Sequence, residues 1–167
     1  EDWRYSDVAA VASVWPVPAP TTIRVNAGEA RSDALLQDAV DDAVVVRDYV
    51  ITLAAGARLD FHLLNVGGRL GRVTFDVRLE EGAHFGLHAA IIGGDEQTLE
   101  LITTVSHAEP DATSEQVVRT VMGGRATGNY LGKIAVARQA QGTDASQSVK
   151  AMLLSRQATV NAKPELE

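Results

Sequence analysis

The sequence of 167 residues contains no cysteine, and this absence excludes several kinds of site together. Without a thiol the chain can form no disulfide, no thiolate nucleophile and no thiolate metal site. Any chemistry of its own would have to rest on histidine, carboxylate, hydroxyl or amine groups. The absence therefore limits the functions that this chain can perform.

Aromatic residues are also scarce, at 5% of the chain, although 46% of the residues are hydrophobic. Valine, alanine, leucine and isoleucine must therefore fill the interior, and such a core suits thin stacked layers better than a core built around large rings. The length is sufficient for one domain with a real core, so we expect a single domain over residues 1–167.

Positive charge and long apolar runs are lacking as well. The formal net charge is −7 and the sequence pI is about 5.1, which argues against binding of nucleic acid or anionic lipid. No apolar run approaches the roughly 18 residues of a membrane span. The first residues, EDWRYSDV, lack the basic and then apolar order of a signal peptide. We expect a soluble cytoplasmic protein with no nucleic-acid and no membrane partner.

Two stretches ahead of residue 50 contain loop or helix signals. Residues 16–20 read PVPAP, and proline fits neither a helix interior nor a central strand, so we expect an extended connector. Residues 33–46 read DALLQDAVDDAVVV, which predicts a short helix that gives way to a strand at its β-branched tail. The helical positions would be Leu35, Leu36, Ala39 and Val40. The N-terminal part is thus expected to be irregular or helical.

The most informative pattern is a repeat. ITLAAGARLDFH begins at Ile51 and VRLEEGAHFGLH begins at Val77, an offset of 26 residues (77 minus 51). In both copies an alternating strand leads through a glycine turn into a second strand, and His62 matches His88. A unit of two strands at this period predicts successive coils of a β-solenoid. The two histidines would then lie on adjacent strands, about 4.8 Å apart.

Later in the chain the repeat is fainter. The tripeptides IAV, at residues 134–136, and ATV, at residues 158–160, recur with an offset of 24 (158 minus 134). Evenly spaced strands of an ordinary antiparallel sandwich would give a similar pattern, so that architecture stays open at this point.

The segment QAQGTDASQSVKAMLLS, residues 139–155, is ambiguous. Thr143 and Asp144 could cap a helix, in which Val149, Met152 and Leu153 would share one face. Both flanking segments alternate with a period of two, as strands do. Local periodicity alone does not decide between a helix and a turn that leads into a strand.

Glycines at 123, 124, 128 and 132 precede Lys133 and invite comparison with a phosphate-binding loop. A phosphate-binding loop of this type needs four residues between its glycines and a Ser or Thr after the lysine. Here the spacing is three residues and Ile134 follows the lysine. We therefore interpret these glycines as turn and tight-packing positions, and expect no ATP binding.

The histidines of the repeat resemble the first half of a cupin metal motif. Such a motif continues with a second histidine two residues on, where this chain has Leu64 and Ala90. Two histidines alone make a poor metal site, so we predict no metal ligands at His62 and His88.

His107 has hydroxyl and acidic neighbours that would suit a Ser-His-Asp hydrolase. The candidates are Ser106, Ser114, Glu109 and Asp111. Triad members normally converge from separate segments, and the sequence has no G-x-S-x-G elbow. We interpret His107 as the end of a strand before a turn at Pro110.

Paired acids would indicate a β-helix enzyme that acts on polysaccharides. The acids of the repeat region are Asp60, Asp76, Glu80 and Glu81. Asp60 corresponds to Gly86 in the second copy, so it does not stack on another acid. We therefore predict no catalytic residue.

The last third of the chain resembles the core of the SufB/SufD family of iron–sulfur cluster assembly proteins, and most closely its SufD subunit. The matching pieces are His107 with Pro110, residues 114–116, 132–134, 141, 143–145, 147, 153–155 and 163–167. Residues 1–105 agree more loosely, through EDWRY at residues 1–5 and VNAGEA at residues 25–30. The order and spacing of these pieces make the resemblance specific.

This resemblance implies a right-handed parallel β-helix, an all-β solenoid, in which residues 139–155 are a polar turn leading into a strand. It also implies a non-catalytic scaffold subunit that pairs with a SufB paralogue and a SufC ATPase. In the family a helical region that docks the ATPase follows the KPELE segment, so we expect this chain to be a core fragment that is less stable alone and cannot capture the ATPase.

The expected cofactor content follows from the residues as well as from the resemblance. Iron–sulfur clusters are normally held by cysteine thiolates, which this chain lacks. We expect no cofactor on this chain alone, with a cluster or flavin only in the whole complex, and no residue here identifies a flavin site. A carbohydrate-active β-helix enzyme and a cupin-like metal protein stay open as alternatives.

Overall fold

The computed structural model describes residues 8–40 and 42–167, and strands dominate it. In chain order the elements are α1 (Val8–Ala12), β1 (Thr21–Val25), β2 (Ala30–Gln37), β3 (Val44–Leu53), β4 (Arg58–Asn65), β5 (Leu70–Leu79), β6 (His84–Gly93), β7 (Thr98–His107), β8 (Thr113–Met122), β9 (Thr127–Val136), β10 (Asp144–Leu153) and β11 (Thr159–Leu166). Residues 16–20 lie outside any helix or strand, as predicted. Among the described residues no helix is long and apolar enough to cross a membrane.

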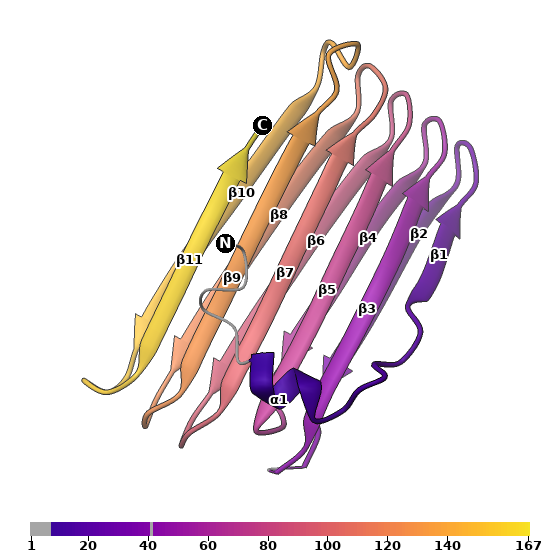
Figure 1. The fold of residues 1–167 in the computed structure, drawn as a ribbon. Helices are drawn as coiled ribbons and strands as arrows, with labels where there is room; N and C mark the ends of the chain where they lie inside the picture. Colours follow the sequence, from indigo (N-terminus) through magenta and orange to yellow (C-terminus); the bar gives the residue numbers. More distant parts are fainter. Residues whose placement is uncertain (1–7, 41) are drawn as a thin grey trace.

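The strands form two parallel sheets that face each other. The odd-numbered strands make one sheet in the order β1-β3-β5-β7-β9-β11, here called sheet A, and the even-numbered strands make the second, sheet B, in the order β10-β8-β6-β4-β2. In Figure 1 the chain rises through sheet A, crosses over, descends through sheet B and returns one position further along, which is a right-handed winding. The predicted parallel β-helix is confirmed, and the antiparallel sandwich is wrong.

The register confirms the repeat that the sequence predicted. Sheet A pairs Ile51 with Val77, and sheet B pairs His62 with His88, both at the offset of 26 residues. Further along the chain the coils lengthen. The IAV and ATV match was wrong, because Ile134 pairs with Leu166 rather than with the ATV segment. Short apolar alternations occur in every strand, so they do not fix a register once the turn lengths vary.

The turns that lead from sheet A to sheet B form a stack of their own. Each turn contains one residue at positive φ, and these are Gly28, Gly56, Gly82, Asp111 and Gly142. The N–H group of each of the first four donates to a carbonyl in the turn of the following coil, as from Gly56 to Glu81 at 2.8 Å. Glycine is favoured there because it adopts positive φ without a steric cost. The glycines therefore recur in the sequence because each of these turns needs a residue at positive φ.

The helix predicted within residues 33–46 is wrong. This stretch contains the end of β2, a turn and the beginning of β3. Leu35 packs against the core, whereas Leu36 is 53% exposed on the outer face. All eight residues of β2 pair in register with β4. A short isolated helix is marginal, so the sheet overrides the local helical spacing.

Residues 139–155 are a turn followed by a strand, as the resemblance implied. The helical spacing of Val149 and Met152 is accidental, because β10 pairs with β8 through all ten of its residues. Val149 packs against the core and Met152 is exposed on the opposite face of the strand. Strand alternation, with period two, decides which side chains are buried.

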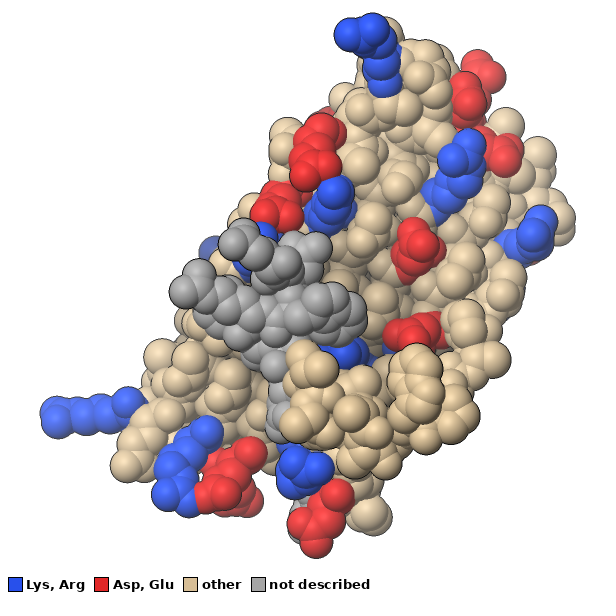
Figure 2. Space-filling model, in the orientation of Figure 1, with Lys and Arg blue, Asp and Glu red and all other residues tan. Residues whose placement is uncertain are grey.

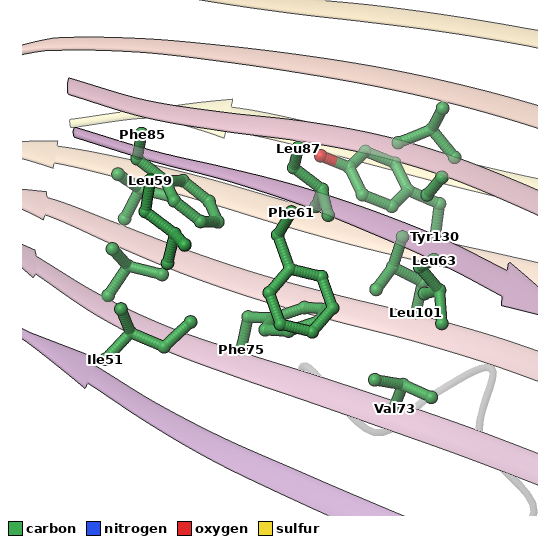
Figure 3. Close-up of a cluster of buried hydrophobic side chains, with 14 of the residues drawn as sticks. Ile51, Leu59, Phe61, Leu63, Val73, Phe75, Phe85, Leu87, Leu101 and Tyr130 are labelled. Atoms are coloured by element: carbon green, nitrogen blue, oxygen red, sulfur yellow. The ribbon is translucent and has the colours of Figure 1, made fainter. Parts of the chain in front are cut away.

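The core lies between the two sheets and contains a small aromatic cluster in the coils near the N-terminus (Figure 3). The ring centroids of Phe61 and Phe75 are 4.8 Å apart at 66°, and Tyr49 lies 5.2 Å from Phe75. Such contacts add about 0.5–1.5 kcal/mol per pair beyond the burial of the rings. Leucine, isoleucine and valine fill the remaining space, as the composition predicted.

Candidate functional site

His62 and His88 lie side by side on the outer face of sheet B. Their ring centroids are 5.3 Å apart with an interplanar angle of 22°, and both side chains are exposed. Nothing among the described residues supplies a group of three or more His, Asp or Glu that could hold a metal ion. The positions of a second cupin histidine hold Leu64 and Ala90, and the strands are parallel rather than antiparallel. The cupin-like alternative is not favoured.

His107 ends β7 before the turn at Pro110, as predicted, and points into the interior. Its Nε2 atom lies 2.9 Å from Ser114 Oγ, and both residues are buried. Nδ1 has no hydrogen-bond partner among the described residues, so no carboxylate orients the ring as in a triad. Asp111 is an exposed turn residue with φ of 60°. The Ser–His pair is sealed in the core and is not arranged as a hydrolase site.

Burial also determines the protonation of His107. Desolvation lowers the pKa of the His107 imidazole below its ordinary value, since a charged ring would lose its hydration in the core. The pKa of His84 is lowered for the same main reason, with Arg58 adding to the effect. A neutral His107 ring is therefore the form that the fold accommodates.

The glycine-rich segment around Lys133 is a strand with its turn, as interpreted from the sequence. Gly124 turns the chain with φ of 55°, and Gly128 lies within β9. A Cβ atom on Gly128 would approach Thr120 Cγ2 to 2.8 Å, so no larger residue fits without a shift. Lys133 Nζ lies 2.7 Å from Glu167 Oε2. The backbone of β9 is paired with β7 and β11 and forms no phosphate loop.

The carboxylates of the repeat region form no paired cluster. Asp60 lies opposite Gly86, as the sequence comparison predicted, and its carboxylate is 3.7 Å from Arg58 and 3.9 Å from His84. Residues 80 and 81 lie in the turn between β5 and β6. This arrangement does not favour the carbohydrate-active alternative.

Sequence reasoning missed a ladder of polar side chains on the outer face of sheet A. Arg72 Nε lies 2.6 Å from Glu100 Oε2, and Asn129 Nδ2 donates to Glu100 Oε1 at 3.2 Å. Asn161 Nδ2 extends the ladder by donating to Asn129 Oδ1 at 2.9 Å. The first three residues are buried although they face outward. The offsets between these residues are unequal, so only the observed register aligns them.

A second polar group lies inside the solenoid, between β7, β8 and β9. Tyr130 Oη donates to Gln116 Oε1 at 3.2 Å and lies 3.3 Å from Thr103 Oγ1. Burial raises the pKa of the Tyr130 phenol. Together with His107 and Ser114 these residues form what we call the interior polar cluster. Its members bond to one another and are buried, although Gln116 Nε2 and His107 Nδ1 have no hydrogen-bond partner among the described residues, so the cluster specifies packing rather than a substrate site.

Charges on the sheet A side of the molecule are mixed. Figure 2 shows lysine and arginine side chains interspersed with aspartate and glutamate over this face, and no large area of one sign. A basic stripe is the usual footprint of nucleic-acid binding. The expectation from the net charge, that the chain does not bind nucleic acid, is unchanged by this face.

One comparison with known proteins matches this chain to a protein family. A family model described as "SUF system FeS cluster assembly, SufBD core domain" matches residues 21–167. The match begins at the first residue of β1 and includes every strand of the solenoid. A search of curated proteins gave no significant match. The chain belongs to the SufBD core-domain family of the SUF system for iron–sulfur cluster assembly.

Proposed function

We propose that this chain is a non-catalytic scaffold subunit of the SUF iron–sulfur cluster assembly complex, of the SufD type, working in the cytoplasm. The observation that carries the proposal is the family match over residues 21–167, which coincides with the two-sheet solenoid from its first strand onward. The SufD type rests on the resemblance of the sequence, which taken as a whole is closer to SufD than to SufB.

The geometry suits a scaffold because it offers extended surfaces on a packed frame. Parallel coils stack their side chains in rows, and each coil contacts its neighbours along two sheets. The interior is filled chiefly by apolar side chains, with a smaller number of buried polar ones. Such a body can position partners through its faces and edges.

The cluster is the cargo of the assembly, and the residues of this chain do not fit the usual means of holding it. Iron–sulfur clusters are bound chiefly by cysteine thiolates, and the chain has none. We propose that a cluster or a flavin is bound only by the whole complex. No step of cluster chemistry is assigned to residues of this chain.

The partners that we propose are a SufB-like paralogue and a SufC-like ATPase. Co-purification tests this directly: the tagged chain is expressed with the SufB-like and SufC-like proteins of the same organism, and the recovered complex is sized. We expect the SufB-like protein to be retained in a defined ratio. A matched control uses a tagged, unrelated acidic solenoid.

Two outcomes would reject parts of the proposal. Failure of the chain to retain the SufB-like protein would reject its place in the complex. When a SufD-like protein is co-expressed as a competitor, its retention in preference to the SufB-like protein would reject the assignment to the SufD type.

A further inference from the structure

The outer face of sheet B presents a groove with an apolar floor. The groove has a volume of about 460 Å³, is open to solvent and crosses β2, β4, β6 and β8. Two rows of outward side chains line it, each row held in register by the strand pairing. One row runs through Ala34, His62, His88 and Val117, and the second through Leu36, Leu64, Ala90 and Arg119.

The groove is apolar at one end and basic at the other. Leu36 and Leu64 are 53% and 37% exposed, so apolar surface is left in contact with water. The second row ends in Arg119, and Lys150 lies next to it on β10. None of the described residues that line the groove is acidic.

Arg119 retains donors for a ligand. Its Nη1 atom donates to the carbonyls of Val118 and Ser148 at 3.0 and 2.9 Å, and Nη2 donates to Ser148 Oγ at 3.3 Å. These bonds to described residues use three of the five N–H groups of a guanidinium. The bonds also hold the side chain in place, so the two remaining donors are pre-positioned for a carboxylate.

The form of the groove indicates the conformation of its occupant. The backbone groups of β4 and β6 are paired within sheet B, so an extended peptide lying on this face would find no main-chain partners. An α-helix satisfies its own backbone and needs only a side-chain surface. The span from β2 to β8 is three strand spacings, about 14 Å, which corresponds to roughly ten residues of helix.

From these observations we infer that the groove docks an amphipathic α-helix of another subunit of the assembly, with apolar residues over Leu36 and Leu64 and a carboxylate bound at Arg119 and Lys150. The inference rests on the proposed function, because that function supplies the assembly. Charge complementarity selects the acidic end of the helix, since the lining contributes Arg119, with Lys150 beside it on β10, and no acidic residue. A second copy of this chain would bring the same cations to the same face.

Because the chain has no cysteine, one introduced thiol reports on one position. Leu64→Cys places a thiol in the groove, and Val50→Cys places one on the outer face of sheet A at a matched exposure of 38%. The rate of maleimide labelling is measured for each variant alone and in the complex purified with the SufB-like and SufC-like proteins. We expect the complex to abolish labelling at position 64 and to leave labelling at position 50 unchanged.

A photo-crosslinker at position 64 then identifies the occupant by mass spectrometry. Crosslinks to a helix of another subunit with an acidic residue near its end support the inference. The variant Arg119→Glu should weaken retention of that subunit, and a lysine in place of the crosslinked acid should restore it, with Arg119→Gln as the uncharged control.

Other results overturn the inference. If the complex forms and position 64 is labelled as fast as in the isolated chain, the groove is not a docking site, while the proposed function stands. Crosslinks to a second copy of this chain, or to an extended segment, also contradict it. If no complex forms, the proposed function fails and this inference fails with it.

Discussion

The interior of the solenoid changes character between its N-terminal and C-terminal coils. Between β3 and β6 most inward side chains are apolar, with Phe61, Phe75 and Phe85 at the centre, and Asn65 is a buried polar exception. Between β7 and β10 the same inward rows contain the interior polar cluster and Gln147. One backbone geometry therefore encloses two chemically different cores.

The difference separates two ways of stabilising the same coil. Burial of apolar area is non-directional and contributes about 25 cal/mol per Å², so the N-terminal coils gain most from packing. In the C-terminal coils part of that gain is replaced by hydrogen bonds, whose net contribution is about 1 kcal/mol each. Buried polar atoms without a hydrogen-bond partner among the described residues occur in both halves: Gln37 Nε2 and Asn65 Oδ1 in the N-terminal coils, and His107 Nδ1, Gln116 Nε2 and Gln147 Nε2 in the C-terminal coils. We expect the C-terminal coils to open first.

The largest effect should follow from removing a ring of the aromatic cluster. Phe61→Ala leaves a cavity beside Phe75 and should lower the free energy of unfolding by about 3–5 kcal/mol. Urea unfolding monitored by circular dichroism measures this change. A loss below about 1 kcal/mol would show that this cluster does not dominate the N-terminal core.

The stacked turns allow one backbone position to be compared in both halves. A Cβ on Gly82 would meet no heavy atom within 4 Å, so Gly82→Ala adds only the cost of an L-residue at φ of 62°, about 1–2 kcal/mol.

Asp111 occupies the equivalent turn of the C-terminal half at φ of 60°. Asp111→Gly should raise the free energy of unfolding slightly, by a few tenths of a kcal/mol, because aspartate tolerates this conformation better than most residues. Thermal unfolding should show a lower stability for Gly82→Ala and a higher stability for Asp111→Gly. A change in the same direction in both variants would contradict the shared role of these turns.

The interior polar cluster is tested by removing one hydroxyl. Tyr130→Phe deletes the bond to Gln116 and should lower the free energy of unfolding by about 1 kcal/mol. Tyr49→Phe is the matched control in the N-terminal half, since the Tyr49 hydroxyl makes no hydrogen bond with a described residue and should change stability little. Equal losses of stability in both variants would contradict the division of the core into a more apolar N-terminal half and a more polar C-terminal half.

The smallest effect is a pH dependence from His107. The fold holds the pKa of His107 below the ordinary 6.5, so the unfolded chain binds the proton first as the pH falls below that value. The stability is therefore complete above about pH 6.5 and decreases as the pH falls toward the folded pKa. Hydrogen exchange at pH 5 should show faster opening of β7 and β8 than of β4 and β5.

His107→Gln should reduce this pH dependence, and His84→Gln should remove a separate part of it, since burial lowers the pKa of His84 as well. An unchanged pH profile in His107→Gln would show that this histidine is not responsible.

Much of the fold could be predicted because solenoid coils repeat their turn chemistry. The matched glycines at 56 and 82 and the pairing of His62 with His88 follow from one offset, and the structure confirms both. The helix predicted within residues 33–46 failed because sheet pairing decides the state of Leu35 and Leu36, and that pairing is invisible to local periodicity. Unequal coil lengths concealed the later repeats.

The surfaces of the molecule were less predictable than its core. The Arg72–Glu100 pair joins residues 28 apart, and the groove joins residues from four strands, so neither exists as a pattern along the chain. Rows across strands become visible only when every register is known. The sequence around His107 was sufficient to exclude a catalytic triad. The hydrogen bond between His107 and Ser114 could not be predicted, because it depends on the geometry of the turn between β7 and β8.

Reconstitution with iron and sulfide under anaerobic conditions tests whether the complex, and not the chain itself, holds the cluster. Cluster absorbance is followed for the chain alone, for its SufB-like and SufC-like partners, and for the complete complex. We expect no cluster absorbance on the chain alone and a stable cluster that requires the complete complex. A stable cluster on the isolated chain, or full assembly by the partners without it, would show that the chain is not a scaffold of this kind.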